Sequence, residues 1–427
     1  MRKLKILLVG YLPPHMGGIE IGGVASLVLG WAESLSAMRE FDVVLAAPIT
    51  PHYADGRTCI REKGYTIMYE RHEFYHLLRH HRWDRLVFPL GARVLRALNS
   101  RWFGGTTVKD LEMSRIIRDV KPDVVNIHTF FEEAQSVIRN TPSHARVITS
   151  VHGIQLNHTT LDDLPLEERN HYYRLTRDIL AKSDYVAFSS SYNEEYARTN
   201  GLLDGSTNCG VLHDGVDTAF FAPSDKSAAR AQLGINPSGN VVLFVGNLMP
   251  RKSCHHLIEA FSLLSPELRS TSQLIIVGTG PEGHALRTLA TSLSIQDRIL
   301  FVGQVTNRNE VRDWFRLADV FVLPSRSEGL AISVLEAMAC GIPVVSCAPS
   351  IGVYENLVHG ETCLLADYGS VSQLRTHITR ILEDKAFAAS ISHRARDLVV
   401  NEYNWTVRAG ELRDLIRGLE SVAISRR

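Results

Sequence analysis

Short apolar runs alternate with amphipathic stretches along most of the chain. In the first half, runs with the length of buried strands lie at 6–9, 41–47, 123–128, 146–151 and 185–189. After the first of them, apolar residues recur at helical spacing at Leu27, Val28, Trp31 and Leu35. Similar runs return at 241–245, 274–277, 299–302 and 320–323. This pattern predicts an α/β protein with two Rossmann-like domains.

The length supports two domains, because 427 residues exceed what one hydrophobic core usually serves. We place the first domain at 1–222, the second at 223–400 and a C-terminal helical segment at 401–427. The join between the domains, about 222–239, contains Pro223, Pro237 and several serines and is interpreted as a linker.

Composition narrows the function. Forty-six basic and 46 acidic side chains cancel, so net charge gives no reason to expect a nucleic-acid partner. Six scattered cysteines without metal-ligand spacing favour a reduced, cytoplasmic chain. No Asp-x-Asp cluster suggests a metal site. The apolar run after Met1 is too short for a signal peptide, and no stretch approaches the roughly 20 apolar residues of a membrane span.

The stretch 320–345 carries the strongest candidate chemistry. It reads as a strand, a loop at 324–329, a helix at about 330–339, a stop at Gly341 and a second strand opened by Pro343. The loop brings Ser325, Ser327 and Glu328 to a helix N-terminus, where free N–H groups favour a phosphate. Glu336 lies in the otherwise apolar helix and needs a partner, which a ribose diol would supply.

Two glutamates separated by seven residues, followed by residues 337–345, closely resemble the signature of retaining, nucleotide-sugar-dependent glycosyltransferases of family 4. The resemblance implies the GT-B architecture, with two Rossmann-like domains facing across a cleft and a C-terminal helix returning to the first domain. It also implies metal-independent transfer of a sugar from a UDP-, GDP- or ADP-linked donor, without a cofactor. The acceptor would be a glycan or lipid-linked saccharide, as in polysaccharide biosynthesis.

The resemblance assigns roles to individual residues. His152 and Glu328 would act on the transferred sugar, and Glu336 would hold the ribose. Lys252 and Arg251 would bind the diphosphate. Where the family usually has an arginine after the strand glycine, this chain has Asn247, which weakens the match. The remaining donor contacts would come from Gly23, Val305, Gly329, Leu330 and Ala331.

Three points leave alternatives. The first loop offers two glycine pairs, 17–18 and 22–23, and the second fits the family spacing better. Two strands end in histidine, and His152 fits the family while His128 is interpreted as a packing residue or one that supports a site residue. The G-x-G-x-x-G at 278–283 fits a dinucleotide fingerprint, but Asp297 precedes the next strand instead of ending it, so NAD is poorly supported.

The arginine- and aromatic-rich region 69–103 could lie against an anionic membrane surface, making the protein peripheral at the inner face, or form ordinary surface helices. Two functions compete with transfer. One is a sugar-nucleotide epimerase of the same architecture, and the other is a non-catalytic nucleotide-sugar-binding subunit.

Overall fold

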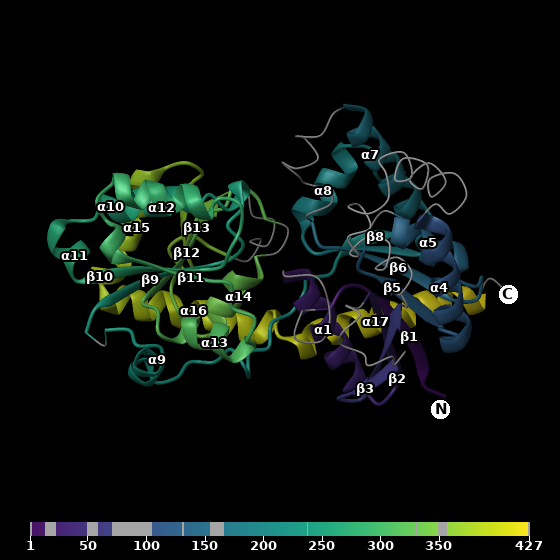
Figure 1. The fold of residues 1–427 in the computed structure, drawn as a ribbon. Coiled ribbons are helices and arrows are strands. Elements are labelled where there is room, and N and C mark those ends of the chain that lie inside the picture. The colour runs from purple at the N-terminus through teal and green to yellow at the C-terminus, as the bar shows by residue number, and fades with distance from the viewer. Residues whose placement is uncertain are drawn as a thin grey trace, which may run out of the picture. The chain divides into compact units, whose positions relative to one another are not determined.

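The computed structural model describes residues 2–12, 23–48, 59–70, 105–129, 132–153, 166–236, 238–328, 331–348 and 357–425. Residue contacts divide the chain into two compact units (Figure 1). Unit 1 comprises residues 1–188, 194–212 and 409–427, and unit 2 comprises residues 189–193 and 213–408.

Unit 1 is built on one sheet, whose described strands run in the order β3-β4-β2-β1-β5-β6-β7-β8. Only the edge strand β3 is antiparallel to its neighbour. The predicted strands are confirmed, with short shifts at their ends. The strands are β1 Leu4–Val9, β2 Phe41–Pro48, β3 Cys59–Glu62, β4 Tyr65–Glu70, β5 Val124–Ile127, β6 Arg146–Val151, β7 Tyr185–Phe188 and β8 Cys209–Val211.

Helices accompany this sheet, and α1 buries the stripe of Leu27, Val28, Trp31 and Leu35 that the sequence predicts. The C-terminal helix α17 groups with unit 1 from Ala409 onward, which confirms the expected return to the first domain. The described helices are α1 Gly23–Ser36, α4 Gly105–Val120, α5 Glu132–Asn140, α7 Leu166–Ala181, α8 Ser191–Thr199 and α17 Trp405–Ser425.

Unit 2 has a fully parallel sheet in the order β11-β10-β9-β12-β13-β14. The chain starts at the centre, winds outward to one edge and then returns to build the other half. This is the doubly wound order, with its switch point between β9 and β12, where ligands bind beyond the strand ends. The strands are β9 Asn240–Val245, β10 Ser272–Val277, β11 Ile299–Gly303, β12 Val320–Leu323, β13 Val344–Ala348 and β14 Leu364–Asp367.

The core of unit 2 is formed by these strands and the apolar faces of the helices around them. Cys340 and Cys363 are buried in it as predicted, and burial raises the pKa of each thiol to about 12. The described helices are α9 Lys226–Gln232, η3 Pro250–Lys252, α10 Cys254–Ser262, α11 Pro266–Ser270, α12 Gly283–Ser292, η4 Gln296–Arg298, α13 Arg308–Arg316, α14 Ile332–Ala339, α15 Val371–Glu383 and α16 Lys385–Glu402.

The interpretation of residues 222–239 as an irregular linker is wrong. This segment contains the helix α9, capped by Asp225, whose side chain accepts from Ser227 N. Arg230 on α9 is buried and pairs with Asp319 at 2.6 Å. The prolines and serines that suggested a loop flank a short alanine-rich helix, and its burial against unit 2 depends on the distant Asp319.

Candidate functional site

The loops after β9 and β12 meet at the switch point of unit 2. Arg326 N donates to the carbonyl oxygen of Arg251 at 2.7 Å, which joins the two loops through their backbones. Lys252 Nζ lies 2.5 Å from Glu328 Oε1, and Arg251 Nη1 lies 3.1 Å from Glu328 Oε2. Arg251 also donates to the carbonyl of Ser327 at 3.2 Å. The structure therefore brings Glu328 to the adjacent residues Arg251 and Lys252, which lie more than 70 positions earlier in the sequence.

This ionic cluster is removed from water. The exposed fraction is 3% for Glu328 and 9% for Lys252. Burial acts to raise the pKa of Glu328, but the charges of Lys252 and Arg251 and a hydrogen bond from Ser325 outweigh it and lower that pKa. Burial, with Arg251 as a second cation, lowers the pKa of Lys252 against the opposing attraction of Glu328. Two cations against one carboxylate give the cluster a net positive charge.

The helix α14 begins beside this cluster. Its N-cap residue Ala331 is buried and has φ −81° and ψ 79°, so the helix starts at Ile332, later than predicted. Ala331 offers no side-chain cap to the first N–H groups of the helix. These groups remain suited to an anion from outside the chain. The predicted contacts Gly329 and Leu330 lie outside the described residues.

Glu336 lies in the second turn of α14 and differs from Glu328. Among the described residues it has no hydrogen-bond or ion-pair partner. Burial raises the pKa of Glu336 to about 7, against a lowering effect of Arg308. A half-buried carboxylate without a partner among the described residues is a candidate to accept hydrogen bonds from a ligand.

Two other predicted residues lie at the same edge of the sheet. Asn247 is exposed directly after the turn residue Gly246 at the end of β9. Val305 follows the end of β11 and packs, half-buried, against the core of unit 2. Both stand beyond carboxyl ends of strands, on either side of β10.

The glycines of the G-x-G-x-x-G motif have a packing role. Gly278 has φ 137°, and a Cβ there would overlap the carbonyl of Gly246. A Cβ on Gly280 would overlap the carbonyl of Leu248. Leu248 N donates to Thr279 O at 2.8 Å, so the turn after β10 supports the loop that carries Lys252. Close backbone packing accounts for these two glycines without a dinucleotide.

In unit 1, the carboxyl ends of β5 and β6 carry a buried histidine pair. His128 Nδ1 and His152 Nε2 lie 2.8 Å apart, with exposed fractions of 1% and 4%. Two residues earlier on each strand, Ser150 Oγ donates to Asn126 Oδ1 at 2.8 Å. Burial, with His152 as a second cause, holds the pKa of His128 well below its usual value. His128 is a hydrogen-bond partner of His152, which agrees with its interpretation as a packing residue or one that supports a site residue.

Of the other residues predicted to act in unit 1, only some lie within the described ranges. Gly23 is the exposed first residue of α1. The competing pair at 17–18 and the first glycine of the pair at 22–23 lie outside the described residues. So does the membrane-contact region 69–103 beyond Glu70.

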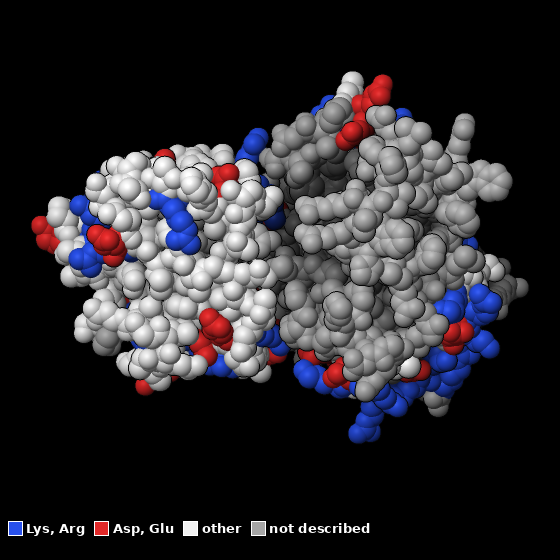
Figure 2. Space-filling view, viewed as in Figure 1, with Lys and Arg blue, Asp and Glu red and all other residues white. Residues whose placement is uncertain are grey.

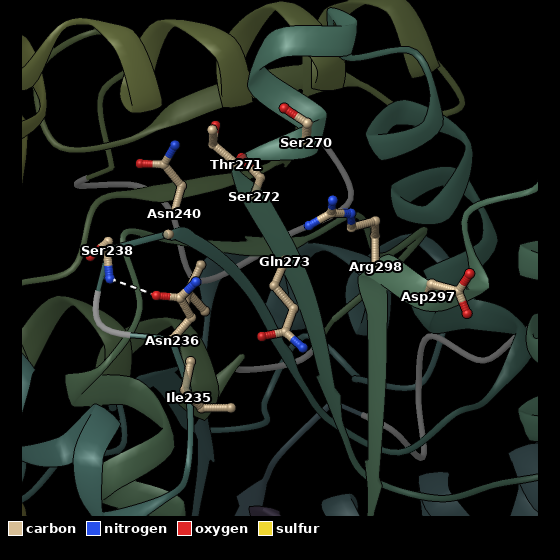
Figure 3. A pocket seen from close by; sticks show the side chains of 12 residues that line it. Ile235, Asn236, Ser238, Asn240, Ser270, Thr271, Ser272, Gln273, Asp297 and Arg298 are labelled. Atoms are coloured by element: carbon tan, nitrogen blue, oxygen red, sulfur yellow. Dashed lines mark hydrogen bonds between the residues drawn. The ribbon is translucent and has the colours of Figure 1, made fainter.

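A separate hollow of about 410 Å³ lies at the opposite, amino-terminal edge of the unit 2 sheet (Figure 3). Its wall is polar, and Ser238 N donates to Asn236 Oδ1 at 2.9 Å. The hollow includes the first residues of β9 and β10 and the turn η4, with Gln273, Asp297 and Arg298. None of the predicted site residues lines it, so it is distinct from the switch-point site.

Within the described ranges, no three His, Cys, Asp or Glu side chains gather as metal ligands would. The described helices include none with the length and apolar character needed to cross a bilayer.

The two sheets define the class of protein. The fold matches the sucrose-phosphate synthase of Thermosynechococcus elongatus with a TM-score of 0.77 at 21% identity, over 98% of this chain and 100% of that one. An Anabaena protein in complex with UDP and glucose matches with a TM-score of 0.70 at 17% identity, over 97% and 100%. These likenesses, together with the switch-point topology of both sheets, identify the GT-B fold.

Sequence comparison then gives the family. The model of the family "Glycosyl transferases group 1" matches residues 225–398. A GDP-mannose-dependent alpha-(1-6)-phosphatidylinositol monomannoside mannosyltransferase of Mycolicibacterium smegmatis is 31% identical over 284 residues, 64% of this chain and 70% of that protein. The protein of the same description from Mycobacterium tuberculosis H37Rv is 29% identical over 78% of this chain and 86% of that protein. The chain belongs to the group 1 glycosyltransferases and is an enzyme of that class, which confirms the resemblance.

Proposed function

We propose that this glycosyltransferase moves a sugar from a nucleoside-diphosphate sugar to a hydroxyl of a glycan or lipid-linked saccharide, with retention at the anomeric carbon. The observation that carries the donor half is the cluster of Arg251, Lys252 and Glu328 beside the uncapped start of α14. Its net positive charge is buried, and a diphosphate would complete it with charge-assisted hydrogen bonds.

In this proposal Lys252 and Arg251 hold the diphosphate and stabilise the charge that develops as it departs. The backbone of Gly329, Leu330 and Ala331 contributes N–H donors at the start of the helix. The bond from the anomeric carbon to the diphosphate oxygen breaks, and a bond to the acceptor oxygen forms on the same face. The acceptor proton leaves with the diphosphate.

Glu328 has two tasks in this proposal. It fixes the positions of both cations through the bonds described above. A carboxylate has about four lone-pair sites, so Glu328 can also accept from a hydroxyl of the transferred sugar. His152, held by His128, would donate a hydrogen bond to the same sugar.

The nucleoside half of the donor is assigned to the other predicted residues. Glu336, which has no partner among the described residues, would accept from both ribose hydroxyls. Val305 and Asn247 would border the base at the ends of β11 and β9, and Gly23 would border the ligand from the first loop. Asn247 and Val305 are supported by their places beyond strand ends, where ligands of doubly wound sheets bind, and Glu336 by its lack of a partner among the described residues.

The relatives narrow the candidate substrates. The mycobacterial proteins are described as GDP-mannose-dependent and as acting on a phosphatidylinositol monomannoside. Two actinobacterial relatives are described as D-inositol 3-phosphate glycosyltransferases. We therefore propose GDP-mannose and UDP-linked hexoses as the first donors to try, with a lipid-linked saccharide as the first acceptor.

The test is a thermal-shift series with UDP, GDP, ADP and NAD on the wild type and two site variants, Lys252→Met and Glu336→Gln. A nucleotide at 100 times its dissociation constant adds about 2.7 kcal/mol, a shift of a few degrees. One nucleoside diphosphate should shift the melting temperature of the wild type; the shift should be lost in Lys252→Met and reduced in Glu336→Gln. The exposed residues Lys385 and Glu383, also in unit 2, give the matched controls Lys385→Met and Glu383→Gln.

The sugar conjugate of that nucleotide is then incubated with and without acceptor. Transfer predicts that free nucleoside diphosphate accumulates when acceptor is present and that the product keeps the anomeric configuration of the donor. Release of an epimerised nucleotide sugar without acceptor would contradict the proposal, as would nucleotide binding with no turnover in any acceptor series.

A further inference from the structure

A second hollow, of about 950 Å³, lies in unit 1 at the amino-terminal edge of its sheet. It is bounded by the start of β1, by Asp42 near the start of β2, by the last turns of α4 and by the end of α5. The histidine pair follows the carboxyl ends of β5 and β6, so this hollow is at the other edge of the sheet. No residue assigned to donor or acceptor lines it.

The side chains that line this hollow carry mostly positive charge. Five cationic side chains border it against a single carboxylate, that of Asp42, in a chain whose charges otherwise cancel. Figure 2 shows lysine and arginine atoms gathered near the position where Figure 1 marks the N-terminus. The cations are Arg2, Lys3, Lys5, Arg118 and Lys121, and His144 also lines the hollow.

Two of these cations have partners inside the chain. Arg2 pairs with Asp123 at 2.5 Å. Lys5 Nζ donates to the carbonyl of Val120 at 3.2 Å, where it satisfies the C-terminal end of α4. Complementing a helix dipole therefore explains Lys5 and contributes to the placement of Arg118 in the last turn.

That explanation does not extend to the rest of the cluster. Lys3, Arg118 and Lys121 are exposed and have no ion-pair partner among the described residues. Like charges around one concave surface repel one another, and an anion from solution relieves this repulsion. The polar side chains of Ser114 and Asn140 line the same hollow, above the buried Ile117.

We propose that this hollow binds a ligand with two or more phosphate groups, at a site separate from the nucleotide-sugar site. Arginine binds phosphate through paired N–H donors and lysine as a point charge. The volume is at the upper end of the usual range for ligand pockets, roughly 300–1,000 Å³, and exceeds the need of a single phosphate. The phosphates belong either to a soluble compound or to the headgroups of anionic lipids.

The experiment uses the full chain and inositol hexakisphosphate as the probe, measured by calorimetry. The pocket variant combines Lys3→Gln, Arg118→Gln and Lys121→Asn. Asparagine is chosen at 121 because the backbone there is left-handed, with φ 52°. The control variant removes the same charge from three exposed arginines that do not line the hollow, by Arg61→Gln, Arg174→Gln and Arg375→Gln.

We expect one probe molecule per chain, with binding retained in Lys252→Met and weakened about tenfold or more in the pocket variant. The control variant should change the affinity less than about twofold. Equal weakening in both triple variants would reduce the effect to net charge and overturn the proposal. Absence of binding in the wild type, or its loss in Lys252→Met alone, would overturn it as well.

A second measurement identifies the source of the phosphates. The same variants are sedimented with vesicles of phosphatidylcholine, with and without phosphatidylinositol bisphosphate. Retention on the anionic vesicles that the pocket variant loses assigns the site to a lipid headgroup, whereas probe binding without retention assigns it to a soluble ligand. The side chains substituted in the two triple variants are exposed, so unchanged melting temperatures are expected in both.

Discussion

The two sheets place different chemistry at equivalent positions. In unit 2 the strand ends carry a buried ionic cluster, in which Lys252 and Arg251 face Glu328. In unit 1 they carry a buried histidine pair, in which His128 and His152 share one hydrogen bond. The topology fixes where a ligand can bind in each sheet, whereas the side chains decide its charge. The ionic cluster of unit 2 has the charge to bind a diphosphate, whereas the histidine pair of unit 1 can form hydrogen bonds with sugar hydroxyls.

The largest expected difference between the two edges is in stability. Glu328→Ala leaves two cations buried without their anion and should lower the free energy of unfolding by about 3–5 kcal/mol. His152→Ala removes one neutral hydrogen bond and should cost about 1–2 kcal/mol. Urea unfolding of both variants measures the two losses. Equal losses would show that the unit 2 cluster is not effectively buried.

The next largest expected effect is on catalysis and nucleotide binding, in which the two sites should differ. Lys252→Met should lower kcat/KM by about 10²–10³, the usual range for losing one donor to developing charge, and should abolish nucleoside diphosphate binding. His152→Ala should lower kcat while leaving nucleotide affinity unchanged, because His152 is assigned to the sugar. Initial rates and calorimetry with the preferred nucleotide test this separation. A His152→Ala variant that loses nucleotide affinity would contradict it.

The histidine pair predicts that the stability of the folded protein falls in acid. His128 has a lowered pKa in the folded state, so the unfolded chain binds a proton first as the pH falls below about 6.5. Stability is therefore present above pH 6.5 and declines below it, by up to about 2 kcal/mol at pH 5. The stability of His128→Gln should fall less than that of the wild type below pH 6.5. His171 is exposed, so the stability of His171→Gln should fall as much as that of the wild type. Calorimetric melting between pH 5 and 8 measures the difference.

The smallest expected effect on ligand binding concerns Glu336, whose titration changes stability with the opposite sign to that of His128. Its pKa is about 7 in the folded protein and about 4.3 in an unfolded chain. Nucleotide affinity should rise about tenfold from pH 6 to pH 8, because only the ionised carboxylate accepts from both ribose hydroxyls. Titration of the preferred nucleotide across this range tests the slope.

Glu336→Gln supplies the control for that slope. Its nucleotide affinity should be weaker and no longer carry this pH dependence. Without ligand, the folded state of the wild type holds the Glu336 proton more tightly than the unfolded state, so this group lowers stability as the pH rises from about 4.5 to 7. Glu336→Gln should remove that fall, and Glu383→Gln should not. A variant that keeps the wild-type slope would assign the titration to another group.

Sequence periodicity and motif spacing determined much of this protein. The apolar runs located most strands of both sheets, because buried parallel strands need continuous apolar residues, but they did not locate β3 and β4. The stretch 320–345 identified the loop and helix that carry Glu328 and Glu336, and its glutamate spacing identified the family. These features are local, so each can be recognised within a single window of the chain.

Only the tertiary structure decided which side chains meet. The sequence assigned Lys252 to a phosphate and Glu328 to a sugar, but their ion pair depends on two loops brought together by the strand order β9-β12. The bond between His128 and His152 likewise depends on β5 and β6 being neighbours. The helix α9 within the presumed linker is fixed by Arg230 reaching Asp319, 89 positions away. Such contacts follow from chain crossings that no local pattern encodes, and for that reason the sequence specified the chemical groups while the fold specified their partners.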